Sequence, residues 1–542
     1  NEPNRDHPPR VPAYPHYSSM SNHPDVKLYD TTLRDGTQGE GVNFSSLDKI
    51  RIAKELDAFG MHYIEGGWPG SNPKDVSFFE RAAEIEWKNA RIAAFGSTRR
   101  KDIGVEDDGQ VRTLLDAKTP VITFFGKSWR LHVTEILGTT EKENQAMIRD
   151  TTRYLKEHGR EVVYDAEHFF DGYKDAPEHA LATLAAAKEG GADWLVLCDT
   201  NGGTLPHEIA EITEVVFRTL GIPVGIHTHD DTGVAVANAL AAIRAGANQV
   251  QGTMNGYGER VGNCNLTTVI PNLQLKMERN VVADLSRLTH LSHFVDDLAN
   301  NSHNIRAPYV GSTAFAHKGG MHVNAVQKVA HSFEHITPAI VGNRQRILVS
   351  ELSGQSNVLM KAEELGLKVE KGSPEALEIL KSLKELEEQG YEFEAAEASF
   401  ELLIRQHQKT YQPLFELKEY HCTFRRDGVR DYQTCAATVK LVVNGVEEYR
   451  VAEGDGPVNA LDAALRKALR SAYPHIDQME LQDYKVRIID SHMGTAAKTR
   501  VLILSSADHE TWGTVGVSYN IIEASWRALV DSVEYFLTKR RS

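Results

Sequence analysis

Short apolar segments rich in β-branched and aromatic residues recur along the first half of this chain, each separated from the next by a stretch of helical character. Their starts lie about 25 to 40 residues apart, the length of one strand plus one helix. The segments are 26–29, 63–65, 92–95, 121–124, 162–164, 195–197, 224–227 and 250–252. The pattern predicts repeated βα units.

Helix start and stop signals fall between these segments. Ser45 or Ser46 can cap a helix that ends at Gly60. Pro177 can open one that ends at residues 190–191, and Pro206 can open one that runs to residue 220. Eight such units predict a TIM barrel over residues 25–300, with its active site at the C-terminal ends of the strands. A doubly wound open sheet with two extra strands is the structural alternative.

Composition excludes several classes of function. The chain has 542 residues and a formal net charge of -15, so its surface has no general affinity for nucleic acid or acidic membranes. We find no apolar run long enough to span a membrane and no signal peptide. Four widely spaced cysteines suggest neither a disulfide scaffold nor a cysteine zinc site. We expect a soluble, cytoplasmic protein with a flexible tail at residues 1–24.

Polar and charged side chains follow seven of the eight predicted strands. This is the edge at which a TIM barrel carries its chemistry. The polar groups are 30–38, Glu65, 127–132, 165–168, 199–201, 227–231 and 255–263.

His227 and His229 are the sharpest feature among them. Residues two apart at a strand end point to the same face, so the two imidazoles can bind one ion. Asp35, after the first strand, supplies the carboxylate we expect beside them. This ligand set accepts manganese, magnesium, cobalt or zinc and does not select among them. The alternative is that the histidine pair is incidental polar surface.

Three motifs resemble the acyl-CoA-condensing branch of the DRE-TIM metallolyases, which contains the 2-isopropylmalate, homocitrate and citramalate synthases. They are the run 30–38, the His227 and His229 pair, and the loop 258–263. Within this branch the chain is most similar to the long bacterial citramalate synthases, through segments 64–73, 126–129 and 164–172.

The resemblance implies a metal-dependent Claisen condensation of acetyl-CoA with an α-keto acid, followed by thioester hydrolysis. The implied acceptor is pyruvate, the product is (R)-citramalate, and the reaction opens a route to isoleucine. The metal would chelate the keto acid as a Lewis acid. The implied ligands are Asp35, His227 and His229, with Asn263 as a fourth.

The resemblance also assigns roles at other strand ends. Arg34 would stabilise the keto oxygen as it becomes an alkoxide, and Glu167 would act as a general acid or base. For Glu167 the alternative is a salt-bridged loop residue, and for Glu65 a structural ion pair. We expect substrate contact or orientation of the site from Gln38, Glu65, Thr200, Tyr164 and His132.

Beyond the barrel, residues 301–418 are expected to form helical subdomains that complete the site and link it onward. His322 matches a catalytic histidine of the family, with a structural histidine as the alternative. Phe333 stands where the family usually has tyrosine, and Asp230 where asparagine is usual. Neither change removes a metal ligand, but Phe333 leaves the proton donor open.

Residues 419–542 carry an internal repeat of two strands and a helix. A hairpin turning at Asn444 and Gly445 leads into a helix after Gly456, and strands 499–504 and 511–518 lead into a second helix. We expect an α+β domain with a duplicated ββα-like unit. It resembles the regulatory domain of the same synthases, which implies isoleucine as effector and a homodimer or higher homo-oligomer. A purely structural dimerisation domain is the alternative.

Two other functions stay open at this point. A sister synthase that uses a larger keto acid such as 2-oxoisovalerate would differ only in the size of its pocket, and a methylene group contributes only about 1–3 kcal/mol to such selectivity. A non-catalytic amino-acid-binding protein is the second, motivated by Phe333.

Overall fold

The computed structural model describes residues 25–317, 333–347, 369–370, 373–393, 395–408, 411–427, 432–489, 491–508 and 510–541. The predicted tail, 1–24, and the predicted catalytic residue His322 lie outside these ranges.

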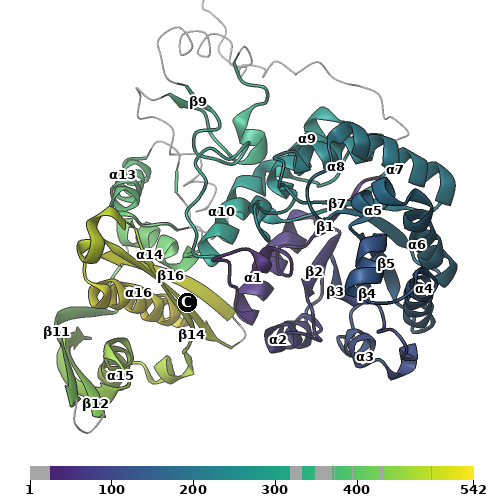
Figure 1. Ribbon diagram of the computed structural model, residues 1–542. Coiled ribbons are helices and arrows are strands. Elements are labelled where there is room, and N and C mark those ends of the chain that lie inside the picture. The colour runs from purple at the N-terminus through teal and green to yellow at the C-terminus, as the bar shows by residue number, and fades with distance from the viewer. Residues whose placement is uncertain are drawn as a thin grey trace, which may run out of the picture.

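Eight parallel strands close into a barrel in the order of the sequence, with β1 paired to both β2 and β8. This confirms the predicted TIM barrel and excludes the open doubly wound sheet. Figure 1 shows these strands on the right of the molecule, enclosed by helices. The strands are β1 (Lys27–Asp30), β2 (Tyr63–Gly67), β3 (Arg91–Ser97), β4 (Val121–Lys127), β5 (Glu161–Glu167), β6 (Trp194–Asp199), β7 (Val224–Thr228) and β8 (Gln249–Gly252).

Three helices around the barrel begin and end at the predicted signals. Ser45 and Asp48 form a capping box at the start of α1 (Ser46–Phe59), and Gly60 ends it with a left-handed φ of 106°. Proline opens α6 (Pro177–Gly190) and α7 (Pro206–Leu220). The others are α2 (Pro73–Ala82), α3 (Gly109–Asp116), α4 (Glu141–Glu157), α5 (Phe169–Asp175), α8 (Ala235–Arg244), α9 (Leu266–Lys276) and α10 (Leu288–Leu298).

Alternation along the strands divides the core into two parts. One set of strand residues packs on the surrounding helices, for example Leu28, Ile64 and Ile122. The other set fills the barrel as a separate buried cluster: Tyr29, Tyr63, Ala93, Val121, Val163, Trp194, Val196 and Cys198. The packed interior gives the polar residues at the strand ends a rigid base.

The segment after the barrel is described only in part. Two short strands, β9 (Ala316–His317) and β10 (Arg346–Ile347), pair in parallel. The helices α13 (Pro374–Gln389) and α14 (Glu397–His407) follow, and the buried residues of α14 pack with those of β16.

The C-terminal part contains two copies of a three-strand and one-helix unit. The first is β11 (Phe415–Asp427), β12 (Tyr432–Val443), β13 (Val446–Gly454) and α15 (Pro457–Leu469). The second is β14 (Glu480–Ile488), β15 (Thr499–Ala507), β16 (Glu510–Ser518) and α16 (Ile521–Arg541). The predicted turn at Asn444 and Gly445 is present, with φ of 50° and 78°. Each unit has one strand more than predicted, β11 or β14.

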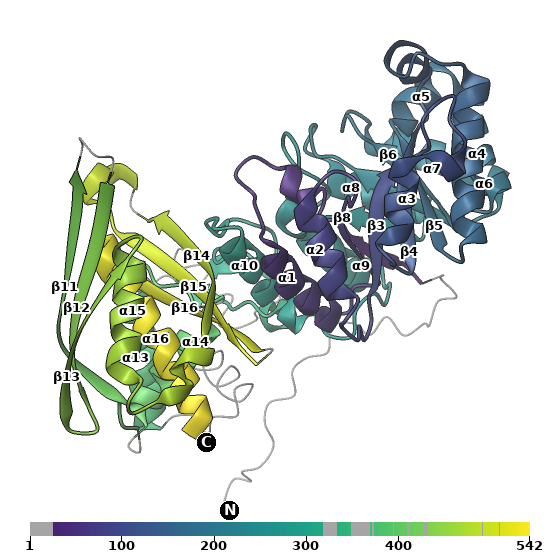
Figure 2. The ribbon, with the colours of Figure 1, turned by 90° about the horizontal axis from the view of Figure 1, so that it is seen from below.

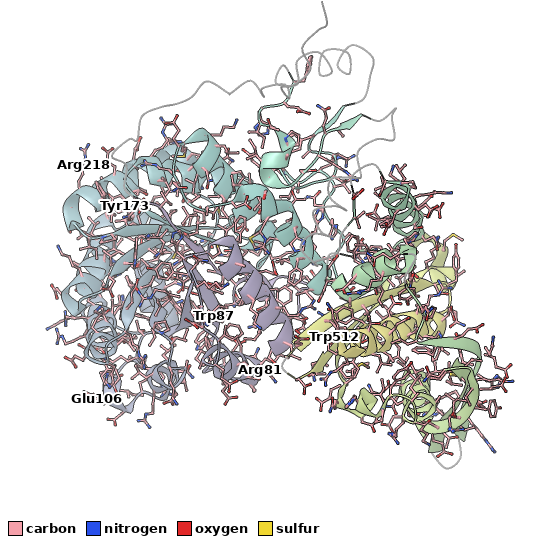
Figure 3. The ribbon with its side chains drawn as sticks, turned by 180° about the vertical axis from the view of Figure 1, so that it is seen from behind. Arg81, Trp87, Glu106, Tyr173, Arg218 and Trp512 are labelled. Atoms are coloured by element: carbon pink, nitrogen blue, oxygen red, sulfur yellow. The ribbon has the colours of Figure 1, made fainter. Side chains whose placement is uncertain are left out.

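The two units share one core. Buried side chains of β12, α15, β15 and α16 belong to a single cluster, and both helices lie between the two three-stranded sheets (Figure 2). Trp512 of β16, labelled in Figure 3, is buried there, and its indole N–H donates to Ser532 Oγ at 2.9 Å. Among the described residues, no helix is both long and apolar enough to cross a membrane.

Candidate active site

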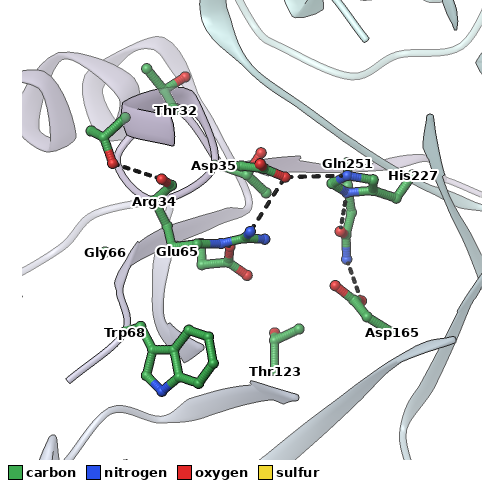
Figure 4. Close-up of polar contacts among 12 residues, drawn as sticks. Thr32, Arg34, Asp35, Glu65, Gly66, Trp68, Thr123, Asp165, His227 and Gln251 are labelled. Atoms are coloured by element: carbon green, nitrogen blue, oxygen red, sulfur yellow. Dashed lines mark hydrogen bonds and ion pairs between the residues drawn. The ribbon is translucent and has the colours of Figure 1, made fainter. Parts of the chain in front are cut away.

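Three predicted metal ligands meet at the C-terminal end of the barrel. His227 Nε2 lies 3.3 Å from Asp35 Oδ2. The Nε2 atoms of His227 and His229 are 3.3 Å apart. All three side chains are buried, and Figure 4 shows Asp35 between Arg34 and His227. The fold therefore brings together residues from β7 and from the loop after β1.

The geometry and the donor chemistry fit a divalent ion. Ligand atoms bound at about 2.0–2.1 Å lie about 2.8–3.0 Å apart at neighbouring octahedral positions and about 3.3–3.4 Å apart in tetrahedral sites, close to the separations seen here. Burial alone would raise the pKa of Asp35, but Arg34 and His227 hold it well below its ordinary value. Burial lowers the pKa of His229 to about 4, which leaves its imidazole neutral. The set therefore offers one carboxylate and a neutral imidazole, as a metal requires.

Asn263 lies where a fourth ligand is expected. It forms an isolated antiparallel bridge with His229. Its Oδ1 atom is buried and has no hydrogen-bond partner among the described residues. A buried acceptor left unpaired is costly, and a metal ion would satisfy it.

A chain of hydrogen bonds orients His227 from the side of its ring that faces away from Asp35. Its Nδ1 atom lies 2.9 Å from Gln251 Oε1. Gln251 Nε2 in turn donates to Asp165 Oδ1 at 3.1 Å, so the amide oxygen faces the histidine. With Nδ1 donating to that oxygen, Nε2 is the ring atom that faces Asp35 and would bind the ion. Burial and the charge of Glu65 raise the pKa of Asp165 to about 7.

Arg34 is clamped on several sides. Its Nε atom donates to Glu65 Oε1 at 2.6 Å, and Nη1 lies 3.4 Å from Asp35 Oδ2. The guanidinium stacks 3.7 Å above the ring of Phe95. Glu65 also accepts from the hydroxyl of Tyr29 at 2.7 Å and is fully buried. The arginine is therefore fixed next to the ligand cluster.

The ends of β4, β5 and β6 carry the other predicted residues. Glu167 accepts a short hydrogen bond from the Lys127 ammonium, so it is ion-paired in this structure. Thr200 Oγ1 accepts from the backbone N–H of His168 at 2.9 Å. The ring of His132 lies 4.3 Å from that of His168, and burial lowers the pKa of His132.

Two predicted substrate contacts are not supported. Tyr164 is fully buried outside the barrel interior, where it packs with Phe124 and lies 3.3 Å from Ser128 Oγ. It precedes Asp165 by one position and so faces the opposite side of the strand. Tyr164 therefore lies on the helix side of β5, and its contact with substrate stays a prediction. Gln38 is exposed in the short helix η1 (Gly36–Gln38), and no side-chain contact joins it to the ligand cluster among the described residues.

Asp230 and Phe333, the two residues that differ from the usual family pattern, lie in different surroundings. Asp230 Oδ1 accepts from the backbone N–H of Ala235 at 2.8 Å, at the start of α8. Phe333 is 47% exposed.

Sequence reasoning placed Asp165 among the polar strand-end residues but gave it no role, and it missed Gln251, Tyr29 and Thr123, which lie behind the ligands. Gln251 faces the barrel interior from the middle of a strand, where an apolar residue is usual. This inward-facing polar residue in β8 was the sequence signal that could have identified Gln251 as part of the site.

Comparisons with known proteins agree with this geometry. Residues 25–295 match the HMGL-like family, 309–391 the homocitrate synthase post-HMGL domain-like family, and 394–537 the LeuA allosteric (dimerisation) domain. The chain is 55% identical to a (R)-citramalate synthase of Aquifex aeolicus, over 95% of this chain and 98% of that protein. It is 54% identical to a (R)-citramalate synthase of Synechocystis, over 94% and 96%.

A probable 2-isopropylmalate synthase of Methanopyrus kandleri is 30% identical, over 95% of this chain and 99% of that protein. The identity to this relative is much lower at the same coverage. The chain therefore belongs to the HMGL-like family and, within it, to the (R)-citramalate synthases.

Proposed function

We propose that the protein condenses acetyl-CoA with pyruvate to give (R)-citramalate and CoA. The identity of 55% to a (R)-citramalate synthase carries the proposal, and the buried cluster of Asp35, His227 and His229 supports it. In the reaction a methyl proton of acetyl-CoA is removed, and the enolate carbon bonds to the keto carbon of pyruvate. The keto oxygen takes up a proton, and water then cleaves the thioester and releases CoA.

A divalent metal held by Asp35, His227, His229 and Asn263 would supply Lewis-acid activation of the keto acid. Arg34 contributes a fixed positive charge beside the cluster, where the alkoxide develops. Because Glu65 and Phe95 hold the guanidinium, it does not have to reorganise during the reaction. Thr200 orients the carboxylate of pyruvate through its hydroxyl.

Glu167 is the general acid or base in this proposal. Its ion pair with Lys127 orients the carboxylate at the end of β5. Lys127 and Glu167 are paired across neighbouring strands, so both point to the same side of the barrel wall. His322 would activate the hydrolytic water, and His132 would border the substrate.

Regulation belongs to the same proposal. The C-terminal units would bind isoleucine, the end product of the route that citramalate enters, and would join two chains in a homodimer. All four cysteines are free thiols, which fits a reducing compartment, and we place the enzyme in the cytoplasm.

The test is CoA release from acetyl-CoA with pyruvate or with 2-oxoisovalerate, followed by chiral analysis of the product. We expect release with pyruvate, (R)-citramalate as product, and inhibition by isoleucine. Release with 2-oxoisovalerate alone would move the protein to the 2-isopropylmalate synthases. Release with neither keto acid would contradict the proposal.

A further inference from the structure

The loop after β8 carries Asn263 in an unusual backbone conformation. Asn255 and Arg260 have positive φ angles of 59°, and Gly256, Gly258 and Gly262 have φ of 71°, 155° and 109°. Left-handed conformations at non-glycine residues persist only where surrounding contacts enforce them. The contacts that hold this loop therefore bear on where Asn263 lies.

Helix α10, outside the barrel, provides the strongest of these contacts. The buried carboxylate of Asp296 accepts a short hydrogen bond from the Tyr257 hydroxyl and a second bond, of 2.6 Å, from Asn255 Nδ2. Ser292 Oγ donates to Asn255 Oδ1 at 2.6 Å. Burial and the Asp296 charge raise the pKa of Tyr257, so its phenol stays protonated as a donor.

The main chain of Tyr257 continues this connection to Asn263. Its carbonyl accepts from Asn263 Nδ2 at 3.2 Å and from Thr253 Oγ1 at 2.6 Å. With the amide nitrogen of Asn263 held in this way, its Oδ1 atom points away from the Tyr257 carbonyl. This Oδ1 atom is buried and has no hydrogen-bond partner among the described residues. The orientation of the Asn263 amide thus depends on where the Tyr257 carbonyl lies.

The same loop also packs against the turn that follows Arg34 and Asp35. A Cβ atom on Gly39 would lie 3.0 Å from the carbonyl oxygen of Gly258. A Cβ atom on Gly258 would lie 2.1 Å from Asn263 Nδ2. The loop is therefore closely packed on this side, and the hydrogen bonds from α10 hold its other side.

We propose that Tyr257 and Asp296 are positioning residues that orient Asn263 as a metal ligand, acting from outside the barrel. The proposal rests on the metal site of the proposed function. Both residues act through Asn263. Residues that hold a metal ligand in place typically change metal affinity by about 10–100-fold when they are substituted.

The test measures Co2+ affinity and the visible spectrum of bound Co2+ in the chelator-treated full chain. We expect Tyr257→Phe to weaken Co2+ binding about 10–100-fold and to alter the spectrum. A cavity of about 230 Å³ borders Tyr257 and Asp296, so water can replace the lost hydroxyl and the variant should fold. The matched control is Tyr309→Phe, which removes a hydroxyl that donates to Asn272 at 3.0 Å.

A double-mutant cycle separates positioning from general destabilisation. Once Asn263→Ala has removed the amide, adding Tyr257→Phe should weaken Co2+ binding no further. Asp296→Asn, which keeps an acceptor for Tyr257, should stay within about threefold of wild type, whereas Asp296→Ala should match Tyr257→Phe.

Additive losses in the cycle, or wild-type affinity in Tyr257→Phe, would overturn the positioning role while leaving the proposed reaction intact. A wild-type chain that binds Co2+ but does not condense pyruvate would refute the reaction and leave the positioning role standing. A wild-type chain that binds no Co2+ would refute both.

Discussion

Arg34 is held by two carboxylates and one aromatic ring, and this explains how a nearly buried cation can serve the site. Glu65 and Asp35 raise its pKa, against the effect of burial, so that the guanidinium stays charged. Glu65 has no solvent contact, so its two hydrogen bonds, from Arg34 and Tyr29, satisfy its charge. The arrangement is preorganised for an anion that forms during the reaction.

Glu65→Gln tests this arrangement. The amide oxygen can accept from Arg34 or from Tyr29 but cannot replace a carboxylate for both, so the guanidinium loses its fixed orientation. We expect kcat to fall about 10–100-fold, with a smaller change in KM, in steady-state assays of CoA release. Tyr29→Phe removes only the second hydrogen bond and should lower kcat less. An unchanged kcat in Glu65→Gln would show that Arg34 does not depend on this contact.

Gln251→Met tests the support behind His227. The thioether fills a similar volume but does not accept the proton of Nδ1, so the tautomer that frees Nε2 is no longer favoured. We expect metal affinity to fall about 10–100-fold in competition with a chelator. Tyr63→Phe is the control, because it removes a hydrogen bond to Glu161 at the other end of the barrel. Equal losses in both variants would indicate general destabilisation of the barrel.

The candidate ligands could be predicted because they follow strands at the edge where parallel strands end together. Asp35, His227 and His229 are distant in sequence, but the βα repeat alone brings their positions to one rim. Asp165 was recognised only as a polar strand-end residue and Gln251 was not predicted, since a polar residue within a strand gives no sign of which histidine it faces. Tyr164 packs on the helix side of β5 because successive side chains of a strand point to opposite faces.

At the scale of elements, the barrel was predictable because apolar runs and helix signals agree. The segments β11 and β14 were missed for a physical reason. β11 reads FELKEYHCTFRRD and carries many charged residues on an edge strand, so it lacks the apolar run that marked the other strands. β14 is also an edge strand of half-exposed residues.

Ser45→Ala tests the capping box at the start of α1. Ser45 Oγ accepts from the Asp48 backbone N–H at 3.1 Å, and Asp48 Oδ2 accepts from the Ser45 backbone N–H at 2.9 Å. We expect the free energy of unfolding to fall by about 1 kcal/mol in chemical denaturation. Ser46→Ala, at the first helical position, is the matched control and should change it by less than about 0.5 kcal/mol. Equal effects would contradict the assignment of Ser45 as the cap.

At the scale of the whole molecule, the C-terminal units contact the barrel through specific polar groups. Lys485 of β14 donates to Asp48 Oδ2 at 2.8 Å and to the Leu298 carbonyl at 2.6 Å. The contact joins the second unit to the start of α1 and the end of α10 (Figure 2). Both helices are next to loops that carry site residues, so this contact places the second unit close to the elements that hold the site.

Stability should depend on pH through Asp531 of α16. Burial raises its pKa to about 7, from about 3.9 in an unfolded chain. Between these values the folded state keeps a proton that the unfolded state has released, so stability falls as pH rises through this window. Below this window Asp531 is protonated in both the folded and the unfolded state. Above it Asp531 is ionised in both states, and the loss of stability is complete.

Asp531→Asn removes this dependence and keeps an acceptor for Ser399 Oγ, which donates to Asp531 at 2.6 Å. We expect the variant to have a higher Tm than wild type at pH 8, with a difference that shrinks toward pH 5, measured by calorimetry. Asp477→Asn, at a side chain 49% exposed, should show no such gain. A Tm difference that does not change with pH would contradict the assignment.

We expect condensation in this barrel to require one metal ion bound by Asp35, His227 and His229. This is measured by following bound Mn2+ and (R)-citramalate formation in the same titration of chelated protein. No product should form before metal is added, and activity should rise with bound metal until a single ion is bound per chain. Replacing both histidines by alanine should abolish binding and activity together. Undiminished product formation in the chelated protein, or in the histidine variant, would show that catalysis does not depend on this metal site.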